Sequence, residues 1–387
     1  MSKRGNGEGS VGKYKNGWRA RLMIGTKENN KPNIKEFYAP TRKEVINKLN
    51  EYKMQMALGS ISSDNKITLE QWFFTWLFDY RKKDLKAKSF ERYEGLYRNY
   101  IKDSDLGKIK LKDLRVTHLQ VYYNNLLENG ISLPTVIQIN TKLKTCLGEA
   151  EKQEYIRRNY CTMVTLPKYK KEKKLEVLTL EQQQEFINAI KSHDLEVLFL
   201  VALSTGLRIG ELLGLKWSDI NFDDAYLSVN RTLQRTYSID NNGNRKLKVI
   251  EQSPKTSNSI RTVPIPKPIL SKLKQLKIVQ NQYKLKSDGC YLDKSYVFCN
   301  EFGAPIDDKR PGRNLSSILK KLNIEPIKFH GLRKTYATRL FENDVPPKTV
   351  QELLGHSSID ITMDIYTQVM EHKKVEAVEK LDTIFTI

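Results

Sequence analysis

Six side chains in this sequence have the types expected of a site that works on a phosphate group. They are two arginines, two histidines, a lysine and a tyrosine: Arg208, Lys255, His330, Arg333, His356 and Tyr366. Arginine binds phosphate oxygens through paired hydrogen bonds and stays charged at any useful pH. Two arginines from distant parts of the chain could therefore hold both non-bridging oxygens of one phosphodiester. They could also stabilise the extra charge of a five-coordinate transition state.

The tyrosine and the lysine supply the two remaining groups that a transfer reaction needs. A tyrosine hydroxyl is a weak nucleophile at neutral pH, so it needs positive charge and a hydrogen-bond partner nearby. Lys255 lies on a predicted turn between two strands, from which it could protonate a leaving 5′ oxygen as a general acid. Lys246, Lys248 and Lys267 lie near it in sequence, so the lysine is the least specific member of the set.

Short helices are expected to bring these groups together. His330 and Arg333 are three residues apart and share one face of a helix. A second short helix follows, which Gly355 can end in the left-handed conformation, with His356 directly after it. Ser357 or Ser358 can then cap a last helix. The apolar residues predicted to bury the first and last of these helices are Leu332, Tyr336 and Leu340, and then Ile359, Met363 and Tyr366.

Arg208 comes from a separate segment in which a helix breaks and restarts. The run Thr205–Glu211 contains two glycines, and Arg208 sits where the helix begins again. Backbone amides are free at such a position, and the helix dipole favours an anion there.

Composition indicates a polyanionic partner. The 387 residues include 66 Lys and Arg against 45 Asp and Glu, a net charge of +21, which favours nucleic acid; a generally lysine-rich proteome is the alternative. Four widely spaced cysteines without a C-x-x-C pair predict a reduced compartment and no zinc site. No apolar run approaches the roughly 20 residues of a membrane span, and the N-terminus lacks a signal-peptide core. We therefore expect a cytoplasmic protein that does not enter a membrane.

The first predicted domain, residues 1–60, is small and basic. Its strands are expected at 9–14, 18–24 and 34–38 and its helix at 41–58. Within it, 13 Lys and Arg stand against 5 Asp and Glu. A sheet with basic side chains exposed could lie in a DNA groove, although a solvated edge sheet would look similar. The residues proposed to contact DNA are Lys13, Lys15, Arg19 and Arg21.

The second predicted domain, residues 66–167, is helical throughout. An apolar helix begins after Thr68, Ser89 is expected to cap a second helix, and two more helices span about 114–127 and 133–150. Basic helix faces suggest a DNA clamp, although a plain bundle would look similar. The proposed DNA-binding residues are Arg92, Arg98, Lys142 and Lys144.

A charged connector at 168–174 leads to the third predicted domain, residues 175–387, which is mostly helical with a small antiparallel sheet. Thr179 is expected to cap a helix over 181–190, and 195–203 is apolar enough to be buried. Strands are expected at 226–237, 246–252 and 259–265, and helices resume after Pro268. A helix is also expected at 373–381, followed by an apolar tail. The fold class is thus multidomain α+β.

The run Ser204–Leu212, the box His330–Arg333, the triplet Leu354–His356 and Tyr366 together closely resemble the tyrosine recombinases, also called phage-type integrases. The layout is similar to the integrases of temperate phages and conjugative transposons. These have an N-terminal arm-binding sheet, a helical core-binding domain and a mixed catalytic domain. The resemblance spans nearly the whole chain and implies a site-specific DNA recombinase that integrates and excises a mobile element or prophage.

The resemblance also implies a role for each site residue. Tyr366 attacks the scissile phosphate, forms a 3′-phosphotyrosyl link and frees a 5′ hydroxyl. Arg208 and Arg333 hold the phosphate, and His330 and His356 assist by hydrogen bonding or proton transfer. Lys255 protonates the leaving oxygen, and Glu211 orients the site. No position of the family's pattern is missing, so the enzyme is expected to be active. The phosphotyrosine conserves bond energy, so no nucleotide cofactor is needed, and no metal is required.

The partners that the resemblance implies are double-stranded DNA at core and arm attachment sites, a homotetramer on that DNA, and accessory proteins that bend DNA or set direction. The place of action is the bacterial cytoplasm, at the nucleoid. The apolar tail packs either on its own domain or on a neighbouring protomer. Two alternatives remain, a non-cleaving DNA-binding regulator and a type IB topoisomerase. A metal-dependent nuclease is disfavoured because clustered carboxylates are lacking.

Overall fold

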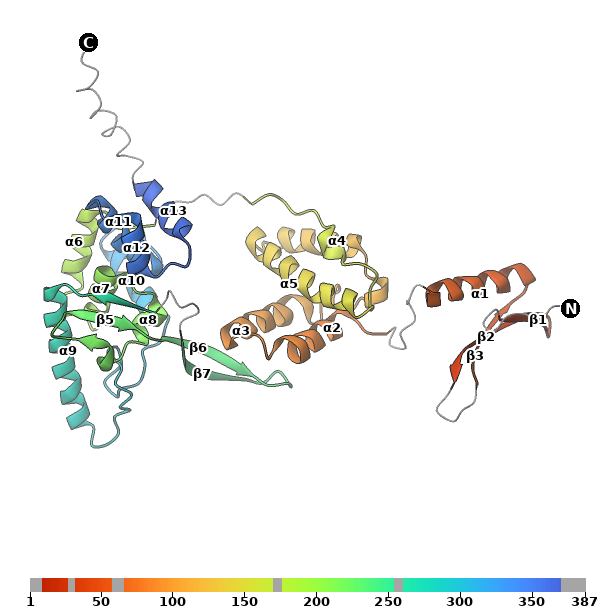
Figure 1. Ribbon diagram of the computed structural model, residues 1–387, viewed down its shortest axis with the longest axis horizontal. Helices are drawn as coiled ribbons and strands as arrows, with labels where there is room; N and C mark the ends of the chain where they lie inside the picture. The colour runs from red at the N-terminus through yellow and green to blue at the C-terminus, as the bar shows by residue number, and fades with distance from the viewer. Residues whose placement is uncertain (1–8, 27–31, 58–65, 170–175, 254–259, 370–387) are drawn as a thin grey trace, which may run out of the picture. The chain divides into compact units, whose positions relative to one another are not determined.

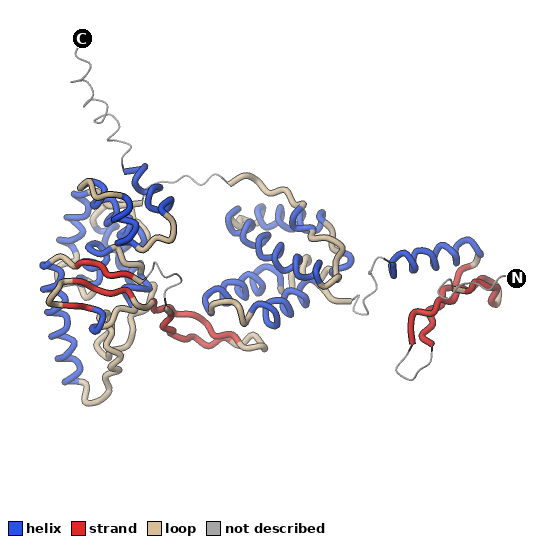
Figure 2. Tube along the Cα trace, in the orientation of Figure 1, coloured by secondary structure: helices blue, strands red, loops and turns tan. Residues whose placement is uncertain are grey.

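The computed structural model describes residues 9–26, 32–57, 66–169, 176–253 and 260–369 (Figures 1 and 2). Its contacts divide the chain into two compact units, residues 1–170 and 171–387, and each part is described by itself. Several predicted features lie outside the described residues: Lys255, the linker at 59–63, most of the connector at 168–174, and the helix at 373–381 with its apolar tail.

The N-terminal part is a three-stranded antiparallel sheet with one helix, as predicted. Strands β1 (Ser10–Tyr14), β2 (Gly17–Thr26) and β3 (Pro32–Ala39) lie in the order β1-β2-β3. Helix α1 (Arg42–Ala57) packs on this sheet. Apolar side chains of both elements form a small buried core: Ala20, Leu22, Ala39, Val45 and Leu49.

The strand register separates the four basic residues proposed to contact DNA. Arg19 and Arg21 alternate with the buried residues of β2, so they face away from α1. Lys13 pairs with Trp18, which packs against the core, so alternation puts Lys13 on the α1 side of the sheet. Lys15 lies in the β1–β2 turn. Strand alternation therefore places these four residues on different parts of the sheet's surface.

Residues 66–169 form a helical bundle, as predicted, and aromatic side chains such as Trp72 and Trp76 fill its centre. Ser89 does not cap a helix, contrary to the prediction. The helix begins at Ala87, and the amide of Ser89 donates to the carbonyl oxygen of Lys86 (2.8 Å) within the first turn. The elements of the bundle are α2 (Leu69–Thr75), η1 (Trp76–Arg81), α3 (Ala87–Leu96), η2 (Tyr97–Ile101), η3 (Leu111–Asp113), α4 (Val116–Glu128), α5 (Leu133–Lys152) and η4 (Tyr160–Thr162). Of these, η1 and η2 are π-helical, and η3 and η4 are 3₁₀ turns.

The C-terminal unit is mostly helical. Helix α7 is apolar on nearly all sides and lies in the core, in contact with α9 and α11 (Figure 1). A capping box at Thr179 begins α6, as predicted. The helices are α6 (Leu180–Ala189), α7 (Glu196–Thr205), α8 (Ile209–Leu213), the 3₁₀ turn η5 (Trp217–Asp219), α9 (Lys267–Lys286), α10 (Arg310–Lys321), α11 (His330–Glu342), α12 (Pro347–Leu354) and α13 (Ile359–Val369).

Two small antiparallel sheets accompany these helices (Figure 2). One contains β4 (Ile220–Asn221), β5 (Tyr226–Val229) and β8 (Arg261–Pro264) in the order β4-β5-β8. The other is a ribbon of β6 (Thr232–Ile239) and β7 (Arg245–Gln252). The single strand predicted at 226–237 is thus two strands in different sheets. The chain turns between them because Asn230 and Arg231 both bind the buried carboxylate of Asp219.

Helices α11, α12 and α13 share a second core, which contains Phe341, Val350, Leu354 and Ile365. The buried face of α13 differs from the predicted one, because its buried residues are Thr362, Ile365 and Val369, whereas Ile359 and Met363 are each 37% exposed. In the described part of the chain, no helix is both long and apolar enough to cross a lipid bilayer.

Candidate active site

Two glycines in the left-handed conformation end the helices that bound the site. Gly206 (φ +62°) ends α7, and Gly355 (φ +65°) ends α12, as the sequence predicted. A Cβ on Gly206 would lie 2.5 Å from Cδ1 of Tyr336 and 2.9 Å from Cδ2 of Leu354. The lack of a side chain at Gly206 therefore lets the end of α7 approach both α11 and α12.

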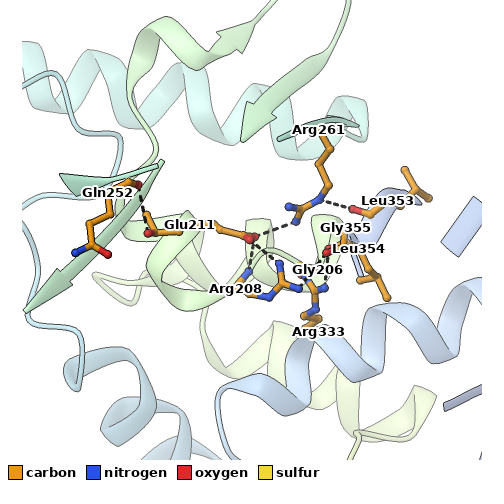
Figure 3. A network of polar contacts seen from close by, with 10 residues as sticks. Gly206, Arg208, Glu211, Gln252, Arg261, Arg333, Leu353, Leu354 and Gly355 are labelled. Atoms are coloured by element: carbon orange, nitrogen blue, oxygen red, sulfur yellow. Dashed lines mark hydrogen bonds and ion pairs between the residues drawn. The ribbon is translucent and has the colours of Figure 1, made fainter. Parts of the chain in front are cut away.

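The C-terminal end of α12 accepts hydrogen bonds from three arginines (Figure 3). Arg261 donates from Nε to the carbonyl oxygen of Leu353 (2.7 Å). Arg333 donates from Nη2 to that of Leu354 (2.6 Å), and Arg208 donates from Nη2 to that of Gly355 (3.1 Å). Helix C-terminal carbonyls lack intrahelical partners and carry the negative end of the helix dipole. One helix end thus fixes three guanidinium groups that come from α8, β8 and α11.

Glu211 joins two of these arginines from the opposite side. Its Oε1 accepts from Nη1 of Arg208 (2.7 Å) and its Oε2 from Nη2 of Arg261 (2.9 Å), while the amide of Arg208 also donates to it (3.0 Å). Burial alone raises the pKa of this carboxyl. The hydrogen bond and charge of Arg261, followed by those of Arg208, outweigh burial and hold the pKa of Glu211 below its ordinary value. The carboxylate therefore stays ionised and braces the site.

The cluster keeps an excess of positive charge, because three guanidinium groups face one carboxylate. Arg333 is only 2% exposed, and its Nη1 donates to the carbonyl oxygen of Gly206 (2.8 Å). Burial and the charge of Arg208 lower the pKa of Arg333 to about 9, against the opposite effect of Glu211. Its Nε is buried without a hydrogen-bond partner among the described residues. This charged side chain thus retains donor capacity for an anion.

Both histidines are neutral near pH 7. His356 is buried, and its Nδ1 lies 2.9 Å from Oγ1 of Thr362. Burial, followed by the charges of Arg333 and Arg208, lowers the pKa of His356 to about 3. His330, at the start of α11, is exposed on one side. Partial loss of hydration, followed by the charge of Arg333, still lowers the pKa of His330 to about 4.

Tyr366 packs against α11 and makes no hydrogen bond to the arginine cluster in the described residues. Its ring packs edge-on against Phe341, with centroids 5.1 Å apart, and it is half-buried on α13. Within the described residues, its hydroxyl makes no hydrogen bond. The connection to the cluster runs instead through Thr362, which lies one turn earlier on α13 and contacts His356.

The sequence analysis missed Arg261, whose side chain is 6% exposed. A signal was present, since Arg261, Val263 and Ile265 alternate along one strand, and the latter two are buried. A charge on the inward face of a strand requires a buried partner. Among the described residues, no group of three His, Cys, Asp or Glu side chains could hold a metal ion.

Comparison with known proteins gives the family. Residues 176–373 match the model described as the phage integrase family, and residues 68–127 match the N-terminal SAM-like domain of phage integrases. The chain belongs to the phage integrase family. The chain is also 43% identical, over 95% of its length and 96% of the relative's, to the tyrosine recombinase XerC-like protein of Caldanaerobacter subterraneus subsp. tengcongensis. This integrase is thus a tyrosine recombinase, an enzyme that breaks and rejoins DNA, as the sequence analysis predicted.

Other relatives agree with this assignment. The ICEBs1 integrase of Bacillus subtilis is 28% identical over 78% of this chain and 79% of its own. A Tn1549 transposon integrase in complex with a circular intermediate DNA has the same fold, with a TM-score of 0.65 and 20% identity over 81% of this chain and 99% of its own. The predicted fold class, with its N-terminal sheet, helical middle and mostly helical C-terminal part, is confirmed.

The predicted DNA-binding residues of the helical bundle of this integrase differ in their surroundings. Arg92, Arg98 and Lys144 are exposed, although Arg98 also pairs with Glu94 (3.4 Å). Lys142 is half-buried and donates to the hydroxyl of Tyr93 (2.9 Å). Lys142 therefore already has a structural partner, whereas Lys144 is fully available at the surface.

Proposed function

We propose that this tyrosine recombinase integrates and excises a mobile element by site-specific strand exchange, with Tyr366 as its nucleophile. The observation that carries the proposal is the pair of guanidinium groups, Arg208 and Arg333, bound to neighbouring carbonyls of one helix end. Guanidinium groups held in this way need little rearrangement when charge develops on a phosphate, which is the condition for efficient electrostatic stabilisation.

In this mechanism, Tyr366 Oη attacks the phosphorus and the bond from phosphorus to the 5′ oxygen breaks. The products are a 3′-phosphotyrosyl link and a free 5′ hydroxyl. His330, whose ring is neutral at pH 7, is the proposed acceptor of the phenolic proton. Lys255 is the proposed donor to the leaving 5′ oxygen. His356, whose Nδ1 faces Thr362, has Nε2 left for the phosphate.

The Tyr366 hydroxyl makes no hydrogen bond within the described residues, and we propose that α13 moves to bring it to a phosphate held by the arginines. The connection from Gly355 to Ser358 links α12 to α13, and that short loop is where such a movement has to be absorbed. We propose that DNA binding supplies the driving interaction, since a bound phosphate would compensate the excess positive charge of the cluster.

We propose three domains for this chain: an arm-binding domain at residues 1–60, a core-binding domain at 66–167 and a catalytic domain at 175–387. On the free face of the N-terminal sheet, the exposed Arg21 and the partly exposed Arg19 support the first, and Arg92, Arg98 and Lys144 support the second. The partners are double-stranded DNA with arm and core sites, and accessory proteins that bend the DNA or set direction. The proposed location is the bacterial cytoplasm, at the nucleoid.

We also propose that four copies assemble on the DNA, as in the solved tetramer of lambda integrase bound to a Holliday junction. A cavity of about 470 Å³ beside the end of α13 supports this, because it offers a seat for the tail of a neighbouring protomer. The Oγ1 of Thr338, which lines this cavity, is buried without a partner in the described part. A Leu180→Arg variant, which changes an exposed residue of the cavity wall, is expected to bind half-sites normally but to form fewer tetramers. A tetramer yield that is unchanged in sedimentation experiments would contradict the proposal that this cavity binds the tail of a neighbouring protomer.

The test of the proposed function uses a duplex that carries a candidate attachment site with a nick just 3′ of the scissile phosphate. The nick lets the short fragment leave, so a covalent intermediate accumulates. Wild type, Tyr366→Phe and the control Tyr283→Phe, which removes an exposed hydroxyl on α9, are run on a denaturing gel with EDTA present. Adducts are expected for wild type and the control only.

The same gel separates the alternatives. A tightly bound site without any adduct leaves the non-cleaving regulator as the explanation. An adduct on any duplex, together with relaxation of supercoiled DNA that lacks an attachment site, indicates a type IB topoisomerase. Cleavage that leaves no adduct and that stops when EDTA is added would point to a metal-dependent nuclease.

A further inference from the structure

Arg261 is a buried cation outside the set of residues expected to touch DNA. It lies at the start of β8, far in sequence from both groups that it binds. Its Nη2 donates to Glu211 Oε2 (2.9 Å) and its Nε to the carbonyl oxygen of Leu353 (2.7 Å). The side chain is 6% exposed, and these hydrogen bonds direct its guanidinium group to Glu211 and to the end of α12. We therefore assign it an effect that passes through these contacts.

The groups that Arg261 binds lead to the two arginines of the proposed phosphate site, Glu211 directly and Leu353 through the next residue. Glu211 binds Arg208 through its other carboxylate oxygen. Leu353 directly precedes Leu354, whose carbonyl binds Arg333. Arg261 therefore ties the carboxylate that braces one phosphate arginine to the helix end that holds the other. Figure 3 shows the Arg261 guanidinium lying between Glu211 and Leu353.

We propose that Arg261 is a positioning residue for strand cleavage, which sets the separation of Arg208 and Arg333 by joining Glu211 to the end of α12. This inference rests on the proposed function, because it assigns Arg261 a part in the same reaction. A displacement of about 1 Å at such a site can cost about 10²-fold in rate. Because Arg261 acts on position, its loss should slow cleavage more than it weakens DNA binding.

The charge of Arg261 also bears on the protonation of Glu211. The charged groups that face this carboxylate are Arg208 at the start of α8, Arg261 on β8 and Arg333 on α11. Burial pushes the pKa of Glu211 upward, and Arg261 is the strongest of the opposing interactions. Without Arg261, Glu211 should take up a proton at a higher pH and then release Arg208. The cleavage defect should therefore deepen as the pH falls.

The experiment measures single-turnover adduct formation on the nicked duplex by the full chain, for wild type, Arg261→Gln, Arg261→Lys, Glu211→Gln and the double variant. Arg261→Gln is expected to cleave about 10²-fold more slowly, with a larger loss at about pH 6 than at about pH 8. DNA affinity should change much less. Arg261→Lys keeps the charge and should restore the pH profile, but not the full rate, because an ammonium lacks the guanidinium fork. The double variant should be no slower than the slower single variant, since both changes interrupt one connection.

The matched control is Arg231→Gln. Arg231 also joins a backbone carbonyl, that of Gly214 (3.4 Å), to a buried carboxylate, that of Asp219, but it contacts neither Glu211 nor α12 in the described residues. The Arg231→Gln variant should lower the unfolding temperature as Arg261→Gln does, but it should not show the pH-dependent loss of cleavage. Equal cleavage by wild type and Arg261→Gln, or equal defects in both arginine variants, overturns the inference alone. A wild type that forms no adduct overturns the proposed function, and the inference with it.

Discussion

The Nδ1 atom of His356 lies 2.9 Å from Oγ1 of Thr362, and both side chains are buried. This hydrogen bond joins the residue that directly follows the end of α12 to the helix that carries Tyr366. Thr362 is one turn before Tyr366 on α13. The orientation of the histidine ring and the position of the nucleophile's helix are therefore fixed by the same contact.

We expect Thr362→Val to destabilise the protein by about 1–2 kcal/mol, because it leaves His356 Nδ1 buried without a partner. Adduct formation should fall as well, since His356 loses its orientation. The control is Thr367→Val on the same helix, where the exposed hydroxyl donates to the carbonyl oxygen of Met363 (2.9 Å). Thermal unfolding and the nicked-duplex gel measure both effects. A Thr362→Val variant that cleaves as fast as the Thr367→Val control would contradict the role of this contact.

Gly206→Ala should be among the most damaging single-methyl changes in the chain. The new Cβ would meet Tyr336 at 2.5 Å, and the residue has a positive φ, so overpacking of roughly 1–3 kcal/mol adds to backbone strain. Gly243→Ala is the matched control, because it also has a positive φ but has open space around it. The difference between their free energies of unfolding isolates the packing contribution. Equal losses would mean that the contact with Tyr336 is dispensable.

Acid should destabilise the C-terminal unit through His356. The pKa of His356 in the folded protein is about 3, below the ordinary value of about 6.5. The unfolded chain therefore binds a proton first, and stability falls as the pH drops below about 6.5. Between about pH 7 and pH 4 the loss is on the order of 3 kcal/mol. Calorimetry should show a shallower decline for His356→Gln, and equal declines in the two proteins would contradict this role of His356.

The N-terminal sheet should contact DNA through its free face, the face that carries Arg19 and Arg21. Arg21→Gln is expected to weaken binding to arm DNA. The slope of the logarithm of the binding constant against the logarithm of the salt concentration should fall in magnitude by about 0.9, because one phosphate contact is lost. Lys13→Gln, on the α1 side, should change the slope little. Filter binding of the full chain over a range of salt concentrations measures both. A larger effect at Lys13 would assign DNA to the opposite face.

Local patterns in the sequence predicted the local parts of this structure. The helix restart at Arg208 and the left-handed end of α12 at Gly355 were foreseen because caps and glycine stops depend on a few neighbouring residues. The capping box at Thr179 is a further case. The family was foreseen as well, because its motifs are contiguous and specific in combination.

The errors arose where distant residues decide the outcome. Periodicity on α13 favoured Ile359 and Met363 as buried residues, but Thr362 is buried because it meets His356 from another segment. The strand predicted at 226–237 is interrupted because Asn230 and Arg231, in the middle of that segment, bind the carboxylate of Asp219. Arg261 was missed because Glu211 and Leu353, which it binds, lie 50 and 92 residues away in sequence. That three arginines converge on one helix end could be recognised only once the fold was known.

The end of α12 offers its arginines backbone oxygens rather than side chains. A carbonyl acceptor is the same whatever residue carries it, so the arginines impose a backbone position and little sequence on this helix. The outward residues of α12, such as the exposed Lys348 and Glu352, are therefore open to substitution. An engineer could therefore redesign that outer surface while leaving the chemistry beneath it intact.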